Sequence, residues 1–265
     1  LPISVLTKGP NPNPKCFLVV YDFGGGTFDV TVISVAKPQG KPTFLVLSTD
    51  GDTHLGGQDI DNALVDLVCA TFQRQFGKNP RSDPRAIWRV RAECEKAKVH
   101  LSQSQSVEIE MELMKEDFCM EVSRTDFINL IQPILDKTLR CVECALKNAN
   151  LNKTMVHDVI LVGGSTRIPR VSDMLREYFG KTPRMTVDAD EAVAIGAALA
   201  GKENGCESVV LTDVTPLSIG VSVLKDRKRV FHVIVPRNTP LPCQNFGHTF
   251  TTVFDDQQMI DIEVS

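Results

Sequence analysis

Two runs of consecutive glycines, each placed directly behind an apolar strand, constrain the fold of this chain more than any other feature. The runs occur in VVYDFGGGTFD (19–29) and in VILVGGSTRIP (159–169). Glycine weakens a strand, so such runs indicate that a ligand or another backbone approaches closely. The amides of glycine turns can donate to phosphate oxygens. One such turn alone is most simply a tight turn, but two in one chain predict a nucleotide site.

Charged side chains lie at and near these runs. Asp22 and Asp29 flank the first run, where carboxylates could hold hydrated Mg²⁺ or orient a water molecule. A helix expected at 84–102 carries a carboxylate, an ammonium and a hydroxyl on one face, which could contact a ribose and an adenine edge. An ordinary solvated helix face is the alternative. The three side chains are Glu95, Lys98 and Ser102.

Hydrophobic periodicity predicts an α/β chain in which a strand meander precedes three helices. The apolar strand at 159–162 is expected to be central in its sheet, and Ser165 or Thr166 is expected to cap the helix that follows. A small-residue helix at 188–203 is expected to pack closely against a neighbour. The remaining predicted elements are strands at 16–23, 28–35, 43–51, 106–113 and 117–123, helices at 56–77, 84–102 and 125–150, and β-type runs after 207.

The composition is typical of a globular protein with a packed core. The apolar fraction of 42% supports a packed core, and a net charge of −4 with mixed signs gives no reason to expect nucleic acid or a membrane as partner. The eight cysteines are scattered and are read as reduced thiols. Cys141 and Cys144, spaced by three, favour a structural role over a metal or redox pair. The proline-rich residues 1–15 suggest a fragment of a longer protein.

Six motifs resemble, in order and spacing, those of the DnaK-type seventy-kilodalton heat-shock chaperones. The resemblance runs from about residue 16 to 262. It implies an actin-like (ribonuclease H-like) ATPase lobe of the α/β class, followed by an apolar linker and the first strands of an all-β peptide-binding sandwich. The motifs are DFGGGTFDV, GDTHLGGQDIDN, CEKAKVHLS, VILVGGSTRIP, DEAVAIGAA and VVLTDVTPLSIG.

The resemblance also divides the chain. Residues 1–207 match lobe II of the nucleotide-binding domain, with subdomain IIB at about 54–133. Residues 208–213 match the interdomain linker, and residues 214–265 match a truncated substrate-binding sandwich. In the family, lobe I precedes these residues. The residues that match the linker and a core phenylalanine of the sandwich are Val209, Val210, Leu211, Asp213 and Phe250.

Roles for single residues follow from the same resemblance. Asp22, Asp29 and Thr27 are the catalytic residues that it implies, and the two acids are assigned to the Mg²⁺ and K⁺ ions. The glycine loop is assigned to the β- and γ-phosphates of ATP or ADP. The residues implied in nucleotide binding are Gly24, Gly25, Gly26, Thr27, Glu95, Lys98, Ser102, Gly163, Gly164, Ser165, Arg167 and Asp190.

Three departures from the family pattern limit the transfer of these roles. Val99 stands where the family has an arginine that would lie on the adenine, which predicts weaker or altered adenine binding. Gln58 replaces an acid. The basic segment 223–231 replaces the family's glycine turn and the peptide-binding arch after it, so no peptide-contact residues are assigned there.

The function that the resemblance implies is that of an ATP-dependent cytoplasmic chaperone. Its partners would be unfolded or extended peptides, J-domain co-chaperones and nucleotide-exchange factors. The intact protein would hydrolyse ATP, whereas this chain, carrying one half of the cleft, would not. Val99 favours a non-hydrolysing relative or a nucleotide-exchange cofactor as the alternative. A sugar kinase or actin-like protein is the third hypothesis, and the β-rich segment after the linker argues against it.

Overall fold

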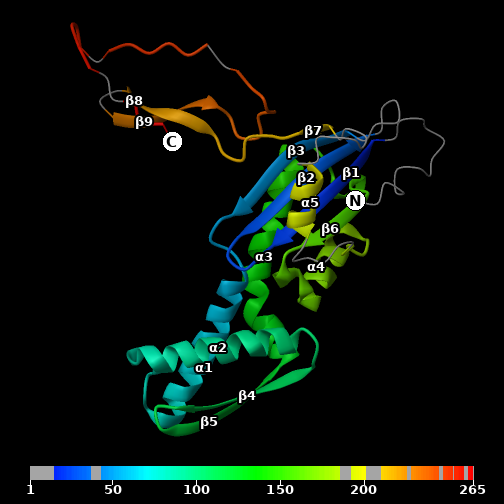
Figure 1. Cartoon of the computed structure of the whole chain (residues 1–265), viewed down its shortest axis with the longest axis vertical. Coiled ribbons are helices and arrows are strands. Elements are labelled where there is room, and N and C mark those ends of the chain that lie inside the picture. The colour runs from blue at the N-terminus through cyan, green and yellow to red at the C-terminus, as the bar shows by residue number, and fades with distance from the viewer. Residues whose placement is uncertain are drawn as a thin grey trace, which may run out of the picture.

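A five-stranded sheet lies in the upper part of the molecule in Figure 1. A separate unit of two helices and a β-hairpin, called the helix–hairpin unit below, lies at the bottom of the same view. A single long helix, α3 (Arg124–Asn148), runs from this unit to the sheet. This computed structural model describes residues 15–36, 43–185, 192–200, 210–225, 228–244, 247–252, 254–259 and 262–264.

The expected meander is confirmed. Strands β1 (Cys16–Phe23), β2 (Phe28–Ala36) and β3 (Thr43–Asp52) pair antiparallel in sequence order. Alternate residues of β1 and β2 are fully buried, which is the pattern of strands with one face on a core. The β1–β2 register places Asp22 directly opposite Asp29, on either side of the glycine loop.

The strand predicted at 159–162 has backbone partners on both edges within the described residues, as a central strand does. Strand β6 (Asp158–Val162) is buried at every residue, pairs in parallel with β1, and forms a parallel bridge from Ile160 to Arg184 on its other edge; it stands first in the strand order β6-β1-β2-β3-β7. Its outer edge is covered by Arg184, which exchanges backbone hydrogen bonds with Val159 and Leu161 and whose Nε lies 2.9 Å from Asp158 Oδ2. Partners on both edges agree with the continuous apolar run of this strand.

Helix α3 covers one face of the sheet. Two buried hydrogen bonds fix it there: the hydroxyl of Tyr21 donates to Thr138 Oγ1 at 2.6 Å, and the hydroxyl of Ser48 donates to the carbonyl of Ala145 at 2.6 Å. The main core lies between α3 and the sheet and continues into the helix–hairpin unit. A smaller cluster on the other face includes Leu18 and Ile160.

The helix–hairpin unit consists of α1 (Gly57–Phe76), α2 (Pro84–Leu101), β4 (Ser106–Leu113) and β5 (Glu116–Ser123). The expected boundaries are close to these. Gly77 ends α1 in the left-handed conformation, and the Asp83 carboxylate caps α2 by accepting from the Arg85 amide. A 3₁₀ turn, η3 (Pro80–Ser82), joins the two helices.

The second glycine run lies between β6 and helix α4 (Pro169–Phe179), as expected. The expectation that Ser165 or Thr166 caps α4 is wrong. The cap position is Ile168, which makes no side-chain cap bond, because the two hydroxyl residues lie earlier, in the 3₁₀ turn η5 (Gly164–Arg167). Another short turn, η4 (Lys153–Met155), precedes β6.

Helix α5 (Ala192–Ala200) forms within the expected range, but its expected close packing is absent over residues 194–198. These residues are exposed, and no atom lies within 4 Å of a Cβ built on Gly196. The surface that these small residues could approach is therefore not supplied by the described part of the chain.

The apolar stretch after residue 209 joins the sheet. Strand β7 (Val210–Thr212) pairs in parallel with Thr43–Leu45 of β3, so the expected linker lies at the sheet edge opposite β6. Val209 lies outside the described residues. Beyond β7, strands β8 (Ile219–Lys225) and β9 (Lys228–Val235) form a two-stranded hairpin.

Phe250 does not occupy a core. It is 48% exposed and contacts His232 and His248. The reason is that β8 and β9 form a single layer, and the described residues provide no second sheet to cover the ring.

Candidate functional site

The two glycine turns meet at the carboxyl ends of β1 and β6. These strands are parallel neighbours, so the turns that follow them lie at the same sheet edge. The hydroxyl of Ser165, which is buried, donates to the carbonyl oxygen of Gly24 at 2.9 Å. Gly163 has a positive φ of 86°, and a Cβ there would lie 2.5 Å from the carbonyl oxygen of Phe23. Close backbone approach therefore explains this glycine.

The amino end of α1 closes on the first turn. The amides of Gly57 and Gln58 donate to the carbonyl oxygens of Gly24 and Gly25 at 3.0 and 2.8 Å. A Cβ on Gly56 would lie 2.5 Å from the backbone of Gly25, which leaves no space for a side chain. The pair of glycines at 56 and 57 is thus needed to seat the helix end against the loop.

Lys98 extends from α2 to the same helix end. Its Nζ lies 2.8 Å from Asp61 Oδ2 and 3.4 Å from the carbonyl oxygen of Gly57, and both charged side chains are mostly buried. Asp61 Oδ1 is buried without a hydrogen-bond partner. Burial raises the pKa of Asp61, Lys98 opposes that shift, and Glu95 adds to it. The pair joins α2 to the amino end of α1, the helix end whose amides contact the first glycine turn.

Asp22 and Asp29 fit a cation. They face each other across β1 and β2, and like charges in this position destabilise a sheet. Burial raises the pKa of both carboxyls, and the charge of Asp29 raises that of Asp22 further. A half-buried carboxylate, Asp22, and an exposed one, Asp29, beside a glycine loop are the oxygen donors that Mg²⁺ binds, usually together with water and phosphate.

The middle of the first loop is open. Gly25, Gly26 and Thr27 are exposed, and a Cβ on Gly25 would have no atom within 4 Å. Backbone approach thus explains the glycine at 163 but does not explain the one at 25. The space above Gly25 is where a ligand would contact the loop backbone.

The other expected site residues lie at varying distances from this centre. Gly164 and Arg167 are exposed on the second turn. Glu95 is exposed on α2, one turn before Lys98. The hydroxyl of Ser102 donates to the carbonyl of Lys98, within its own helix. Asp190 lies outside the described residues.

Sequence reasoning missed four residues that shape the site: Gly51, Gly56, Gly57 and Asp61. The signal was present in the GGQDID stretch, where two glycines precede a helix and an acid occupies its first turns. Gly51 had no such signal, since only the register shows that a Cβ there would lie 2.4 Å from the carbonyl oxygen of Phe28. Gln58 lies beside Gly26 at the loop, on the exposed side of the helix end.

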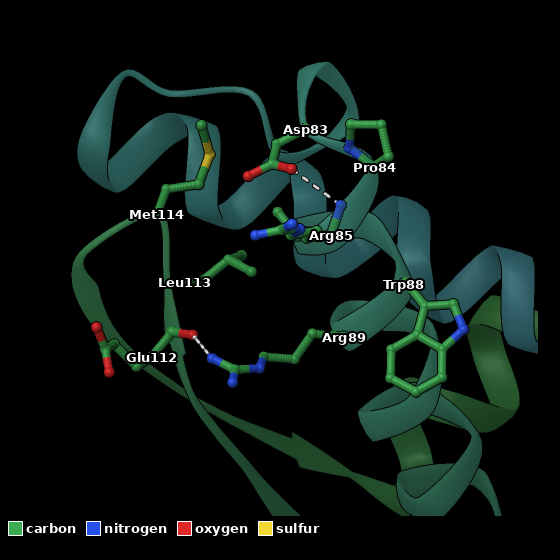
Figure 2. A pocket seen from close by; sticks show the side chains of 9 residues that line it. Asp83, Pro84, Arg85, Trp88, Arg89, Glu112, Leu113 and Met114 are labelled. Atoms are coloured by element: carbon green, nitrogen blue, oxygen red, sulfur yellow. Dashed lines mark hydrogen bonds between the residues drawn. The ribbon is translucent and has the colours of Figure 1, made fainter.

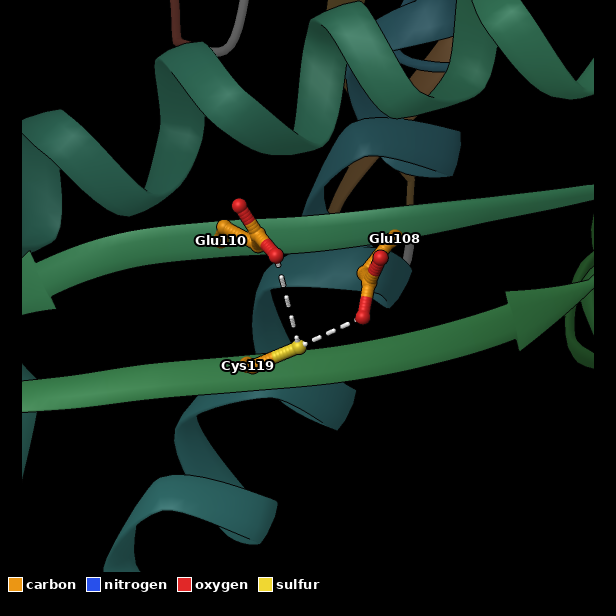
Figure 3. Close-up of side chains that lie close together, drawn as sticks. All are labelled: Glu108, Glu110 and Cys119. Atoms are coloured by element: carbon orange, nitrogen blue, oxygen red, sulfur yellow. Dashed lines mark hydrogen bonds between the residues drawn. The ribbon is translucent and has the colours of Figure 1, made fainter.

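Three potential metal ligands gather elsewhere, on the outer face of the β4–β5 hairpin (Figure 3). They are Glu108, Glu110 and Cys119, whose ligand atoms all lie within 4.8 Å of one another. Among the described residues, no other group of three or more His, Cys, Asp or Glu side chains lies this close together. The thiol lies 3.0 Å from Glu108 Oε1. Its hydrogen bond to Glu108 is the first cause that raises the pKa of Cys119 to about 11. This group lies on the β4–β5 hairpin and includes no residue of the two glycine turns.

Among the described residues, Cys141 and Cys144 belong to no group of three or more potential metal ligands. Burial, followed by the charges of Asp50 and Asp52, raises the pKa of Cys141 to about 11. Both cysteines are free thiols, as are the other described cysteines. Among the described helices, none combines the length and the apolarity needed to cross a membrane.

The sequence that builds this site matches a known protein family. The family model for the Hsp70 protein matches residues 11–265, so the chain belongs to the Hsp70 family. The Hsp70 ATPase domain has an actin-like fold, with which the mixed α/β architecture agrees. Membership of this family leaves no support for the sugar-kinase and actin hypothesis.

A curated relative is the chaperone protein DnaK of Stenotrophomonas maltophilia (strain R551-3). It is 38% identical over 267 residues, which cover 98% of this chain and 41% of the relative. The chain therefore spans about two-fifths of the length of this relative.

Proposed function

We propose that this chain contributes half of the nucleotide cleft of an ATP-dependent molecular chaperone. The observation that carries the proposal is the meeting of the two glycine turns beside Asp22 and Asp29. Exposed loop amides, paired carboxylates and a lysine from a second unit are the groups that a nucleoside polyphosphate with its cation requires. Membership of the Hsp70 family supports the same function.

Each group has a role in this proposal. The backbone of Gly24–Gly26 and the hydroxyl of Thr27 bind the terminal phosphates of ATP or ADP. Asp22 and Asp29 hold Mg²⁺, which neutralises phosphate charge when it is bound, and in the family K⁺ would share these acids. Thr27, Asp22 and Asp29 would position the attacking water.

The second turn and α2 take the nucleoside end. Gly163, Gly164 and Arg167 border the base, while Ser165 holds the first turn through the Gly24 carbonyl. Lys98 would exchange part of its contact with Asp61 for the ribose. Glu95 and Ser102 complete the nucleoside surface, and Asp190 is assigned to the ions or nucleotide by resemblance alone.

We assign residues 1–207 to lobe II with subdomain IIB at about 54–133, residues 208–213 to the linker, and residues 214–265 to the start of a peptide-binding sandwich. The parallel pairing of β7 with β3 supports the linker assignment, because an apolar segment docked on the ATPase sheet can transmit the nucleotide state. Unfolded peptides, J-domain co-chaperones and exchange factors are the proposed partners, in the cytoplasm.

The experiment that tests this function measures ATP binding and ATP turnover on the same sample. Binding without measurable turnover is the expected result, because hydrolysis in this family uses groups from both lobes and these residues match one lobe. Chaperone-like turnover by the chain alone would contradict the division of the cleft. Failure to bind adenine nucleotides would contradict the function itself.

One observation favours the second candidate, a non-hydrolysing relative or exchange cofactor. Val99 is 57% exposed on α2, one residue after Lys98, and offers no cation to stack on an adenine. We expect Val99→Arg to tighten ATP binding by about two- to fivefold through a cation–π contact. Equal affinity of Val99→Arg and wild type would show that Val99 has no such consequence. Val99→Leu is the control for bulk without charge.

A further inference from the structure

Two histidines from separate segments meet beside the β8–β9 hairpin. His232 lies on β9, opposite Val221 of β8, and His248 lies in the segment 247–252. The atoms Nε2 of His232 and Nδ1 of His248 are 3.1 Å apart, and the two ring planes are inclined by 77°. These two residues, called the histidine pair below, share no residue with the proposed nucleotide site.

The contact between the two rings fixes part of their protonation. A neutral imidazole has one N–H nitrogen and one acceptor nitrogen, so in a hydrogen bond between two rings one donates and the other accepts. At least one ring of the pair is therefore neutral, which is the form that binds a metal ion. The donating ring binds the same ion once its proton is carried on its other nitrogen. Both side chains are exposed, so the rings can turn toward a common ion without disturbing the buried core.

The spacing of the two nitrogens matches that of neighbouring ligands on one metal ion. With metal–nitrogen bonds of about 2.0–2.1 Å, two ligand atoms are about 2.9 Å apart at a right angle and about 3.3 Å apart at the tetrahedral angle. The observed 3.1 Å lies between these two values. Imidazole nitrogen is a preferred ligand of zinc, copper and nickel ions.

Phe250 packs against both members of the pair. Its ring centroid is 5.3 Å from that of His232, with the planes at 88°, and 6.5 Å from that of His248, with the planes at 15°. These contacts keep the two imidazoles close together before any ion is bound. Preorganisation of this kind lowers the entropy that the side chains lose when they bind a ligand.

A cavity between the first turns of α2 and the tip of the β4–β5 hairpin is one competing place for a cation (Figure 2). Its lining includes the carboxylates of Asp83 and Glu112, but also the guanidinium groups of Arg85 and Arg89, which repel a cation. The residues that line it include no imidazole and no thiol. This cavity is therefore less suited to a transition metal than the histidine pair.

The second competing place is the group of Glu108, Glu110 and Cys119 on the outer face of the same hairpin. The hydrogen bond to Glu108 is the first cause that raises the pKa of the Cys119 thiol to about 11. A metal ion would have to displace the proton of this thiol, because the thiolate is the form that binds a metal. The neutral imidazoles of the histidine pair carry no such cost at neutral pH.

We propose that His232 and His248 bind one divalent late first-row metal ion, with water at its remaining positions. The ion links β9 to the segment 247–252. In this part of the chain the described residues form a single-layered hairpin without a covering sheet, so a metal link adds a fixed contact where packing supplies few. The proposal does not depend on nucleotide binding.

The test titrates Zn²⁺ into the full chain without nucleotide and follows the imidazole signals of its five histidines by NMR. The signals of His232 and His248 should shift together and saturate on one binding curve. The signals of His54, His100 and His157 are internal controls and should not follow that curve. Mg²⁺ is the control ion and should leave the pair unshifted, because it prefers oxygen ligands.

Variants show whether the two rings bind the same ion. His232→Ala should weaken Zn²⁺ binding at His248 by at least about tenfold, because a single imidazole loses the gain that two linked ligands provide. His248→Ala should have the same effect at His232. His100→Ala, which removes an exposed histidine of α2, and Cys119→Ser should leave the binding curve of the pair unchanged. Circular dichroism checks that each variant is folded.

Four results would overturn the proposal. They are the absence of a saturable shift at either ring, a His232→Ala variant in which His248 keeps the wild-type affinity for Zn²⁺, an equal shift of the pair with Mg²⁺, and loss of the shift in Cys119→Ser. The last result would assign the bound metal to the β4–β5 hairpin instead.

Discussion

The hydroxyl of Ser165 donates to the carbonyl oxygen of Gly24, 141 residues earlier in the chain, at 2.9 Å. This bond joins the two glycine turns that end neighbouring strands. It gives the loop one fixed side, while its middle, at Gly25, stays open to a ligand. Preorganisation of this kind lowers the entropy that a loop loses on binding.

Ser165→Ala should therefore weaken two properties together. Loss of the buried hydrogen bond should lower the free energy of unfolding by about 1 kcal/mol and should also lower nucleotide affinity. Thermal unfolding and a nucleotide titration measure the two effects. Ser106→Ala, at an exposed serine of β4, is the control. A Ser165→Ala variant that keeps full nucleotide affinity would separate this bond from the site.

Alanine at Gly56 and at Gly25, two glycines whose backbones lie in contact, should change the stability of the fold by different amounts. Gly56→Ala should destabilise the fold by about 1–3 kcal/mol, since its Cβ would lie 2.5 Å from the Gly25 backbone. Gly25→Ala should leave stability nearly unchanged, because its Cβ would meet no atom within 4 Å. Urea unfolding of both variants measures the difference. Equal stability of the two would contradict the packing of α1 on the loop.

The raised pKa of Asp22 predicts a pH-dependent effect of Asp22→Asn. A folded-state pKa above the ordinary 3.8 means that the folded chain favours the protonated carboxyl, so this group costs stability as the pH rises through its folded pKa. Without Mg²⁺, Asp22→Asn should be more stable than wild type at pH 7, and the difference should shrink as the pH falls and vanish below pH 3.8.

Thermal unfolding across this pH range measures the effect, with Asp255→Asn at an exposed acid as control. Added Mg²⁺ should stabilise the wild type and narrow the difference at pH 7. An Asp22→Asn variant that is less stable than wild type at pH 7 without Mg²⁺ would contradict the repulsion between Asp22 and Asp29.

Arg237 should couple the segment after β9 to the sheet. Its Nη2 lies 3.1 Å from Asp50 Oδ1 and 3.0 Å from the carbonyl of Thr49, and the Thr49 amide donates to Asn238 Oδ1 at 3.0 Å. A double-mutant cycle of Arg237→Ala with Asp50→Ala should give a coupling of roughly 0.5–1 kcal/mol. Arg229 lies on β9, and its Nη1 is 3.6 Å from Glu263 Oε2. The control variant Arg229→Ala should therefore show no coupling to Asp50. Zero coupling at Arg237 would mean that the contact adds no stability.

The sequence was sufficient to predict the local elements. Periodicity and caps located α1, α2, α3 and the β4–β5 hairpin to within a few residues, because Asp83 and Gly77 encode the helix ends directly. The meander was equally clear, since its strands follow one another. The long-range neighbours of each strand were harder to predict, as shown by β6, whose apolar run indicated burial but not that Arg184 would pair with its outer edge.

The candidate site was predictable in its residue types but only partly in its geometry. Glycine runs revealed both turns, yet sequence alone could not show that Ser165 faces Gly24 or that Lys98 reaches Asp61. Those contacts depend on the packing of distant segments. The prediction that Ser165 caps α4 was wrong for the same reason. Its hydroxyl donates to the Gly24 carbonyl in the first glycine turn, which is distant in the sequence.

Isothermal titration of ADP with Mg²⁺ into wild type and Gly25→Ala tests the central claim most directly. If the open glycine loop binds phosphates, wild type should bind one ADP in a Mg²⁺-dependent manner, and Gly25→Ala should bind clearly more weakly while remaining as stable. No ADP binding by the folded wild type, or equal binding by both chains, would contradict the claim.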